Sequence, residues 1–397
     1  MNQWETIIMR KAHLVLLIAV GILRAVGAAD PYTNPADINN DQTVDAADLA
    51  IFIEAWLSTE AAAVNWNPAC DIAQPSDGVI DARDFSVLTA NWRWRRPEPI
   101  TRIPAGLFTM GDHFAEGSLH ELPLHDVWID TLYIGTFEIT NRQYCDFLNS
   151  ALSTADIRIE QGIVYPADGA QPYFNTYTKD YHSQINYSHA MFSVRTKNGI
   201  DMSDHPVVEV SWFGAAAYCN WRSAQQQLDP CYDLMTWQCD FSGSGYRLPT
   251  EAEWEYLARG GLAAPYTRYP WGDAITGANA NYQDSGDPFT SNNPPQTTPI
   301  GYYNGNQSPI GRCMANGYGL FDTAGNVWEW CNDFYAANYY ASSPCENPIG
   351  PQIGAQRVLR GGGYSTGTDH CRVSYRYYDF PDMRWSFAGF RIVRTAE

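Results

Sequence analysis

One twelve-residue segment near the start of the sequence carries oxygen-bearing side chains at nearly every second position. Calcium takes about six to eight oxygen ligands, and a tight loop supplies them from alternate residues. The predicted ligands, at loop positions 1, 3, 5, 7, 9 and 12, are Asp37, Asn39, Asp41, the backbone carbonyl of Thr43, Asp45 and Asp48. The alternative is a solvated loop whose carboxylates bind no ion, but the regular spacing favours a calcium loop.

An amphipathic helix is predicted directly after this loop. Its apolar residues follow the helical period and are Leu49, Phe52, Ile53, Trp56 and Leu57. A calcium loop followed by a helix is typical of an EF-hand. Two positions depart from that pattern, since Gln42 stands where glycine is usual and Asp48 where glutamate is usual.

A second, weaker copy of the same pattern follows. Its ligand candidates are Asp77, Asp81 and Asp84, together with Asp71 if the loop carries two extra residues around Gln74 and Pro75. The paired loops and helices of residues 34–94 resemble a type I dockerin. This resemblance implies a small all-α module that folds with calcium and binds a cohesin-like protein.

The first residues have the features of an export signal. Arg10 and Lys11 precede an apolar run from Ala12 to Leu23, and small residues follow it. This pattern predicts a signal peptide over residues 1–28 and a secreted or extracytoplasmic protein. An uncleaved membrane anchor is the alternative, although the run is short for a membrane span, and no span is expected in the mature chain. A net charge of −19 argues against binding to nucleic acid.

The cysteines leave the disulfide pattern open. Nine cysteines in an exported chain permit disulfides, and the odd number leaves at least one thiol outside an intrachain bridge. Cys231 and Cys239 lie close enough in sequence to form a bridge, but their connectivity stays open.

A linker over residues 95–100, rich in proline, is predicted to separate the first module from a large domain of residues 101–395. Helices are predicted for Trp212–Gln226, after Ser211 as N-cap, and for Glu251–Arg259, after a capping box formed by Thr250 and Glu253. The predicted strands are Leu107–Met110, Val127–Ile134 and Phe390–Val393. The pattern favours an α+β domain with much irregular structure.

A series of motifs in the large domain then becomes specific. In chain order they include Gly106–Gly111, His205–Trp212, Tyr246–Tyr256, Tyr269–Gly272, Asn316–Asp322, Gly325–Trp330, Arg360–Gly362 and Gly389–Arg391. Together they resemble the formylglycine-generating enzyme family, also called the sulfatase-modifying factor domain. The resemblance implies an α+β fold related to C-type lectins, with calcium ions and packed tryptophans.

The same resemblance implies calcium ligands within the large domain. One site maps to Asn326 and Glu329, and a second maps near Asn281. The alternative is that Asn326 and Glu329 are polar residues that bond their own loop, because an Asn-x-x-Glu pattern alone is weak evidence.

Copper is the point at which this sequence departs from the family. The family enzymes oxidise a substrate cysteine with copper(I), which two cysteines bind just after a Gly-Gly-Ser segment. Here Gly363 replaces the serine, and Cys371 is the one cysteine between Gly361 and Arg372. The pair is therefore absent, a copper site is doubtful, and the catalytic residues stay unknown. Cys371 is a weak candidate, because a single cysteine is more often a disulfide partner or a buried apolar residue.

Three hypotheses about function remain. In the first, the large domain binds a peptide or glycan or has a diverged modifying role. In the second, it is an active formylglycine-generating oxidase that acts on exported sulfatases. In the third, the function is anchoring, and the first module alone carries it. Aromatic residues near the end of the domain suit ligand recognition, although core packing also explains them: Tyr364, Tyr375, Tyr377, Tyr378, Phe380 and Trp385.

Overall fold

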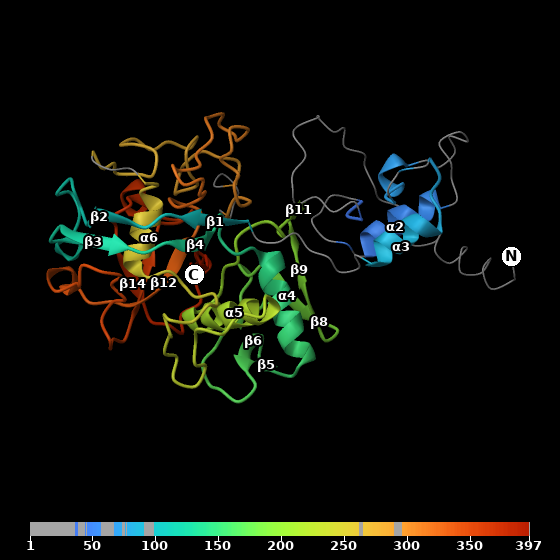
Figure 1. Ribbon diagram of the computed structural model, residues 1–397, viewed down its shortest axis with the longest axis horizontal. Coiled ribbons are helices and arrows are strands. Elements are labelled where there is room, and N and C mark those ends of the chain that lie inside the picture. The colour runs from blue at the N-terminus through green and yellow to red at the C-terminus, as the bar shows by residue number, and fades with distance from the viewer. Residues whose placement is uncertain are drawn as a thin grey trace, which may run out of the picture. The chain divides into compact units, whose positions relative to one another are not determined.

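The computed structural model describes residues 36–38, 44, 46–56, 67–73, 76, 78–90, 99–261, 265–289 and 296–396. These fall into two compact units that divide between Glu98 and Pro99 (Figure 1). The predicted signal peptide, most of the predicted linker, and the candidate ligands Asn39, Asp41, Thr43, Asp45 and Asp77 lie outside the described residues. No helix within the described part of the chain is long and apolar enough to cross a membrane.

The first unit is built from helices α2 (Ala46–Ala55) and α3 (Ala82–Ala90) and the short 3-10 helix η1 (Pro68–Cys70). Phe52 on α2 and Leu88 on α3 are fully buried together with Val44 and Ile80, which precede the two helices. Each helix therefore contributes its apolar face to one small shared core, as the repeated sequence pattern predicts.

The second unit is a mixture of helices and small sheets, which confirms the predicted α+β class. Its first sheet joins β1 (Ile100–Ile103), β4 (Leu132–Gly135) and β16 (Val393–Thr395) in that order. A second sheet has the order β14 (Tyr377–Asp379), β13 (Arg357–Arg360), β12 (Trp328–Phe334) and β15 (Ala388–Gly389).

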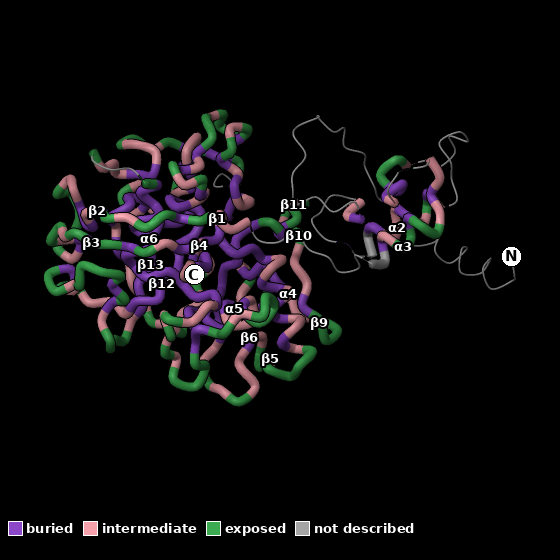
Figure 2. The backbone as a smooth tube through the Cα atoms, viewed as in Figure 1, coloured by how far each residue is buried: buried purple, intermediate pink, exposed green. Residues whose placement is uncertain are grey.

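Shorter elements complete the large domain. One three-stranded sheet joins β5 (Ile157–Glu160), β6 (Ile163–Pro166) and β7 (Phe174–Asn175). The two-stranded pairs are β2 (Gly106–Met110) with β3 (His125–Ile129), β8 (Ile185–Ser188) with β9 (Met191–Val194), and β10 (Thr196–Lys197) with β11 (Ile200–Asp201). The 3-10 turns are η2 (Leu119–Glu121), η3 (Tyr339–Ala341) and η4 (Thr368–Cys371). Buried segments of the backbone run through the middle of the domain (Figure 2).

Both predicted helices are present. Helix α5 (Trp212–Gln225) begins after Ser211, whose side chain accepts a hydrogen bond from the Gly214 amide. Helix α6 (Glu251–Ala258) begins with the predicted capping box of Thr250 and Glu253. A further helix, α4 (Asn141–Ser153), was not predicted, although Thr140 and Gln143 form a capping box of the same kind.

Two strand predictions need correction. Val127–Ile134 is not one strand, because it is interrupted at Asp130 and Thr131, where the chain passes from β3, paired with β2, to β4, paired with β1. The predicted strand Phe390–Val393 is also wrong. Phe390, Arg391 and Ile392 are all buried, and they connect β15 of one sheet with β16 of another. A segment that crosses a core has no exposed face and therefore does not alternate as an ordinary strand does.

Helix α6 supplies the charged centre of the large domain. Arg360 on β13 donates to Glu251 and to Glu255 at 2.7 Å each, and Arg376 donates to Glu251 at 2.7 Å. Arg259 donates to Glu255, also at 2.7 Å. Because these side chains are buried, the network ties α6 to the sheet that carries the glycine-rich segment.

Candidate functional site

The glycine-rich segment follows β13 directly. Gly361 and Gly362 have φ angles of +95° and +75°, which other residues adopt only with strain. A Cβ atom on Gly362 would lie 2.9 Å from the Cys371 sulfur, so glycine is also required by close contact. Thr366 closes the following turn, because its hydroxyl accepts from the Gly363 amide at 3.0 Å.

Cys371 is a buried residue in contact with this segment. It is fully shielded from solvent and packs in a small cluster with Tyr269 and Ala324. Burial is the main cause that raises the pKa of its thiol to about 12. All nine cysteines have free thiols, including Cys231 and Cys239, so Cys371 is not a disulfide partner in this structure.

These residues do not fit a copper(I) site of two thiolates. Copper(I) needs soft, deprotonated sulfur ligands in close proximity. The segment contains one cysteine in place of two, and that residue, Cys371, is buried with a raised pKa. The segment therefore supports no reaction step through copper.

We expect Cys371 to react at least a hundredfold more slowly with iodoacetamide at about pH 8 than the exposed Cys313 and Cys345. Both burial and the raised pKa lower the amount of reactive thiolate. Peptide mapping by mass spectrometry after timed labelling measures the three rates. Unfolded protein is the control, in which all nine cysteines should be labelled, and equal rates in the folded protein would contradict the buried position of Cys371.

Aromatic residues surround the glycine-rich segment in two different ways. The rings of Tyr375 and Tyr377 lie 5.9 and 4.9 Å from the buried Trp328, so these residues contribute to packing. In contrast, Trp385 and Phe380 remain 38% and 46% exposed. The hypothesis of core packing therefore holds for part of the aromatic group and not for the rest.

The Trp385 ring has a fixed position on the surface. Its plane is nearly parallel to the Phe387 ring, with centroids 5.5 Å apart, and its indole nitrogen donates to Asp379 at 2.9 Å. The Tyr364 hydroxyl donates to the carbonyl of the neighbouring Ser386 at 3.1 Å. Residues 385–387 therefore join the exposed aromatic surface to the glycine-rich segment.

Asn281 and Asn326, which the resemblance assigned to two separate calcium sites, lie next to each other. The backbone amide of Asn326 donates to the backbone carbonyl of Asn281 at 2.8 Å. The side-chain oxygen of Asn281 is buried and has no hydrogen-bond partner among the described residues. Buried oxygens need a partner, and calcium binds amide and carboxylate oxygens, so Asn281 fits a calcium site.

Sequence reasoning missed Glu138 at this place. Its carboxylate accepts a hydrogen bond from the Asn326 side chain at 3.3 Å, and its other oxygen is buried without a partner. Burial is the first cause that holds the pKa of Glu138 well above its ordinary value, and the Asp322 and Glu329 carboxylates add to the shift. Nothing in the sequence brings Glu138 close to Asn326, because 188 positions separate them.

Glu329 has a different environment. Both of its carboxylate oxygens accept hydrogen bonds from Arg391 at 2.6 Å, and one also accepts from the Trp254 indole at 2.8 Å. This pairing leaves the side chain of Glu329 poorly suited to calcium. A cation near Asn326 would instead find the free oxygen of Glu138.

In the first unit, the described ligand candidates converge on their loops. Asp48 accepts from the Ile38 amide, and Asp84 accepts from the Ile72 amide. These bonds span 10 and 12 positions, which agrees with two extra residues in the second loop. Asp71 accepts from the Gly78 amide within that loop, and Asp81 accepts from the Arg83 amide at its end. The remaining described candidate, Asp37, directly precedes Ile38.

Comparisons with known proteins identify the families of the two units. Residues 86–396 match the family described as the sulfatase-modifying factor enzyme 1-like domain, and residues 35–91 match the dockerin type I domain. A formylglycine-generating enzyme of Streptomyces coelicolor is 34% identical over 310 residues, which cover 75% of this chain and 89% of that protein.

The same domain also occurs in proteins with other names. A serine/threonine-protein kinase pkn1 of Chlamydia pneumoniae is 32% identical over 76% of this chain, which corresponds to 39% of the kinase. Among solved structures, Treponema denticola variable protein 1 aligns with a TM-score of 0.52 and 26% identity, over 75% of this chain and 95% of that protein. The fold is therefore shared by relatives with different names.

Proposed function

Because this chain belongs to the sulfatase-modifying factor enzyme 1-like family and carries a dockerin type I module before that domain, we propose that it is an exported, calcium-binding protein whose large domain binds a peptide or glycan. A diverged modifying role on the same surface belongs to this proposal. The observation that carries it is the single, buried thiol in the glycine-rich segment. A fold that lacks the two-thiolate site but retains its scaffold is suited to recognition.

The exposed aromatic surface supports the binding role. Trp385 and Phe380 present flat apolar faces, and Asp379 beside them provides a carboxylate. Sugars and peptides bind through such combinations of an aromatic face and polar groups. A ligand bound to this surface would lie next to the glycine-rich segment, because Tyr364 in that segment donates to the Ser386 carbonyl.

The first module supports delivery to a partner. Dockerin modules imply a cohesin-type partner protein, and the signal-like sequence before it fits export. Calcium is proposed for the loops of this module and for the region of Asn281 and Asn326 in the large domain. Under this proposal the module attaches the protein to its partner, and the large domain binds the peptide or glycan.

The alternative function is formylglycine generation, which the name of the Streptomyces coelicolor relative favours. With copper(I) and oxygen supplied, we expect no loss of thiol from a Cys-x-Pro-x-Arg peptide, measured by mass spectrometry. The Streptomyces coelicolor enzyme, treated identically, is the positive control. Formation of formylglycine by this protein would overturn the binding proposal.

A peptide and glycan array tests the binding role directly. We expect retained ligands to be lost in Trp385→Ala and kept in Trp128→Ala. The two tryptophans are a matched pair, because they are 38% and 40% exposed and each donates from its indole to a nearby aspartate. Equal loss in both variants, or no retention by the wild type, would contradict a ligand site at Trp385.

A further inference from the structure

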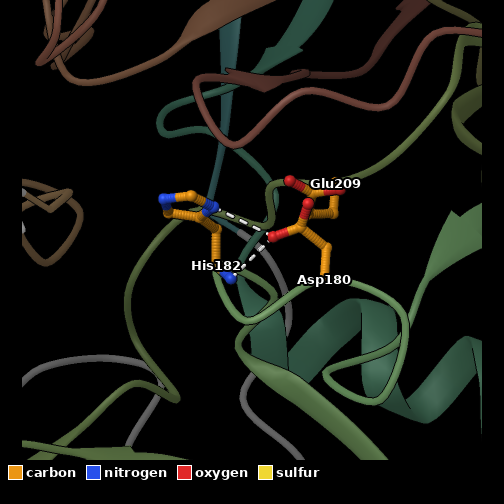
Figure 3. A group of neighbouring side chains, drawn as sticks. All are labelled: Asp180, His182 and Glu209. Carbon is orange, nitrogen blue, oxygen red and sulfur yellow. Dashed lines mark hydrogen bonds and ion pairs between the residues drawn. The ribbon is translucent and has the colours of Figure 1, made fainter.

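Three polar side chains meet on the large domain in a group that the family resemblance does not include. Asp180 and His182 lie in the loop between β7 and β8, and Glu209 lies before α5 (Figure 3). The Asn175 amide donates to the Glu209 carbonyl at 3.0 Å, which holds the two segments together. One potential ligand atom from each side chain lies within 4.8 Å of the other two.

The distances within the group suit a metal ion. In the absence of an ion, the imidazole Nδ1 of His182 forms a hydrogen bond of 2.9 Å with a carboxylate oxygen of Asp180, so both atoms already point to the same place. Two ligands at right angles, each about 2.1 Å from an ion, are separated by about 3.0 Å. Figure 3 shows the Asp180 carboxylate between His182 and Glu209, so the three groups face one shared region.

Glu209 distinguishes this group from an ordinary surface pair. Glu209 is only 2% exposed, and the nearby guanidinium of Arg384 donates to the Asn175 side chain at 2.8 Å rather than directly to the Glu209 carboxylate. Its described side-chain hydrogen bond comes from the Asn175 amide group at 2.7 Å, which leaves its second oxygen without a described donor. A buried carboxylate that has no direct ion pair is costly, and a cation bound to it lowers that cost.

The backbone of Glu209 is also held in an unusual conformation. Its φ angle is +62°, and its amide donates to the Trp385 carbonyl at 2.9 Å. A left-handed conformation in a residue other than glycine persists only where the surroundings impose it, and such residues are concentrated at functional sites. The Trp385 contact therefore fixes the carboxylate next to the exposed aromatic surface.

We propose that Asp180, His182 and Glu209 bind a divalent first-row transition ion such as zinc(II) or manganese(II). One imidazole nitrogen with two carboxylates suits these ions, whereas calcium takes oxygen ligands. Three protein ligands leave positions on the ion for water or for an oxygen atom of a bound molecule. This site is separate from the calcium sites proposed above and does not depend on the proposed binding function.

Cobalt(II) titration of the full-length protein tests this site. With millimolar calcium present to saturate oxygen-only sites, we expect one cobalt ion per chain with weak visible absorption. An intense thiolate charge-transfer band should be absent, because the site contains no sulfur. Such a band on binding would place the ion at cysteines and overturn the proposal.

Variants locate the bound ion. We expect His182→Ala and Glu209→Gln each to weaken cobalt binding at least tenfold, while His189→Ala binds as the wild type does. His189 is an exposed histidine between β8 and β9 and serves as the matched control. If Glu209→Gln alters the thermal unfolding curve, His182→Ala in its partly exposed loop decides the question. Unchanged affinity in His182→Ala, or no binding by the wild type, would overturn the site.

Discussion

Replacing Arg360 with leucine is expected to lower the free energy of unfolding of the large domain by about 3–5 kcal/mol. Arg360 is fully buried, and its guanidinium pairs with both Glu251 and Glu255. Removing it leaves two buried carboxylates that share the remaining charges of Arg259 and Arg376. Urea unfolding at saturating calcium, followed by fluorescence, measures the change.

A surface arginine provides the control for this variant. Arg268 pairs with Glu116 at 2.8 Å, but both side chains are about one-third exposed. Arg268→Leu is therefore expected to have a far smaller effect, because water screens the pair. Adding Glu255→Gln to Arg360→Leu should restore part of the lost stability, since it removes one uncompensated charge. Equal effects of the two arginine variants would contradict a structural role for the buried network.

Removing calcium with a chelator is expected to unfold the dockerin module. The module has a small core, and Asp48 and Asp84 place buried carboxylates at the loop ends. A bound metal is one of the devices that stabilise domains of this size, and an ion at a thousandfold excess over its dissociation constant contributes about 4 kcal/mol. Hydrogen exchange of the full chain should show amide protection in α2 and α3 falling by at least an order of magnitude.

A variant tests whether the loss of amide protection is limited to the dockerin module. Asp48→Ala should remove protection in α2 and α3 even with calcium present, while α5 and α6 keep theirs. Glu54→Gln, an exposed change on α2, is the matched control and should leave protection intact. Protection that persists in the presence of chelator would rule out calcium-dependent folding.

The sequence was informative where structure depends on local patterns. Helix α6 was predicted because Thr250 and Glu253 form a capping box that neighbours in sequence can reveal. Helix α4 has an equally local signal in Thr140 and Gln143 and was nevertheless missed. Its buried face includes Tyr144, Phe147 and Leu148, so the period was visible but interrupted by polar residues.

The candidate sites depend on contacts that local patterns do not contain. Glu138 reaches Asn326 across 188 positions, and Asp180 meets Glu209 through strand and loop contacts. A single sequence shows that a carboxylate is present, but it does not show whether that carboxylate lacks a counter-charge after folding. The pairing of Glu329 with Arg391 illustrates the same limit, since a residue assigned to calcium proves to have a buried arginine partner.

Many contacts of the large domain join residues that are far apart in sequence, and this has a consequence for biosynthesis. Strand β4 pairs with β16, Arg372 pairs with Glu121, and Arg391 donates to the carbonyl of Gly135, 256 positions earlier. Contacts this distant form only after nearly the whole domain has left the ribosome. The large domain of a nascent chain halted before Arg391 is therefore expected to remain unfolded, and an unfolded domain can still be translocated along the proposed export route.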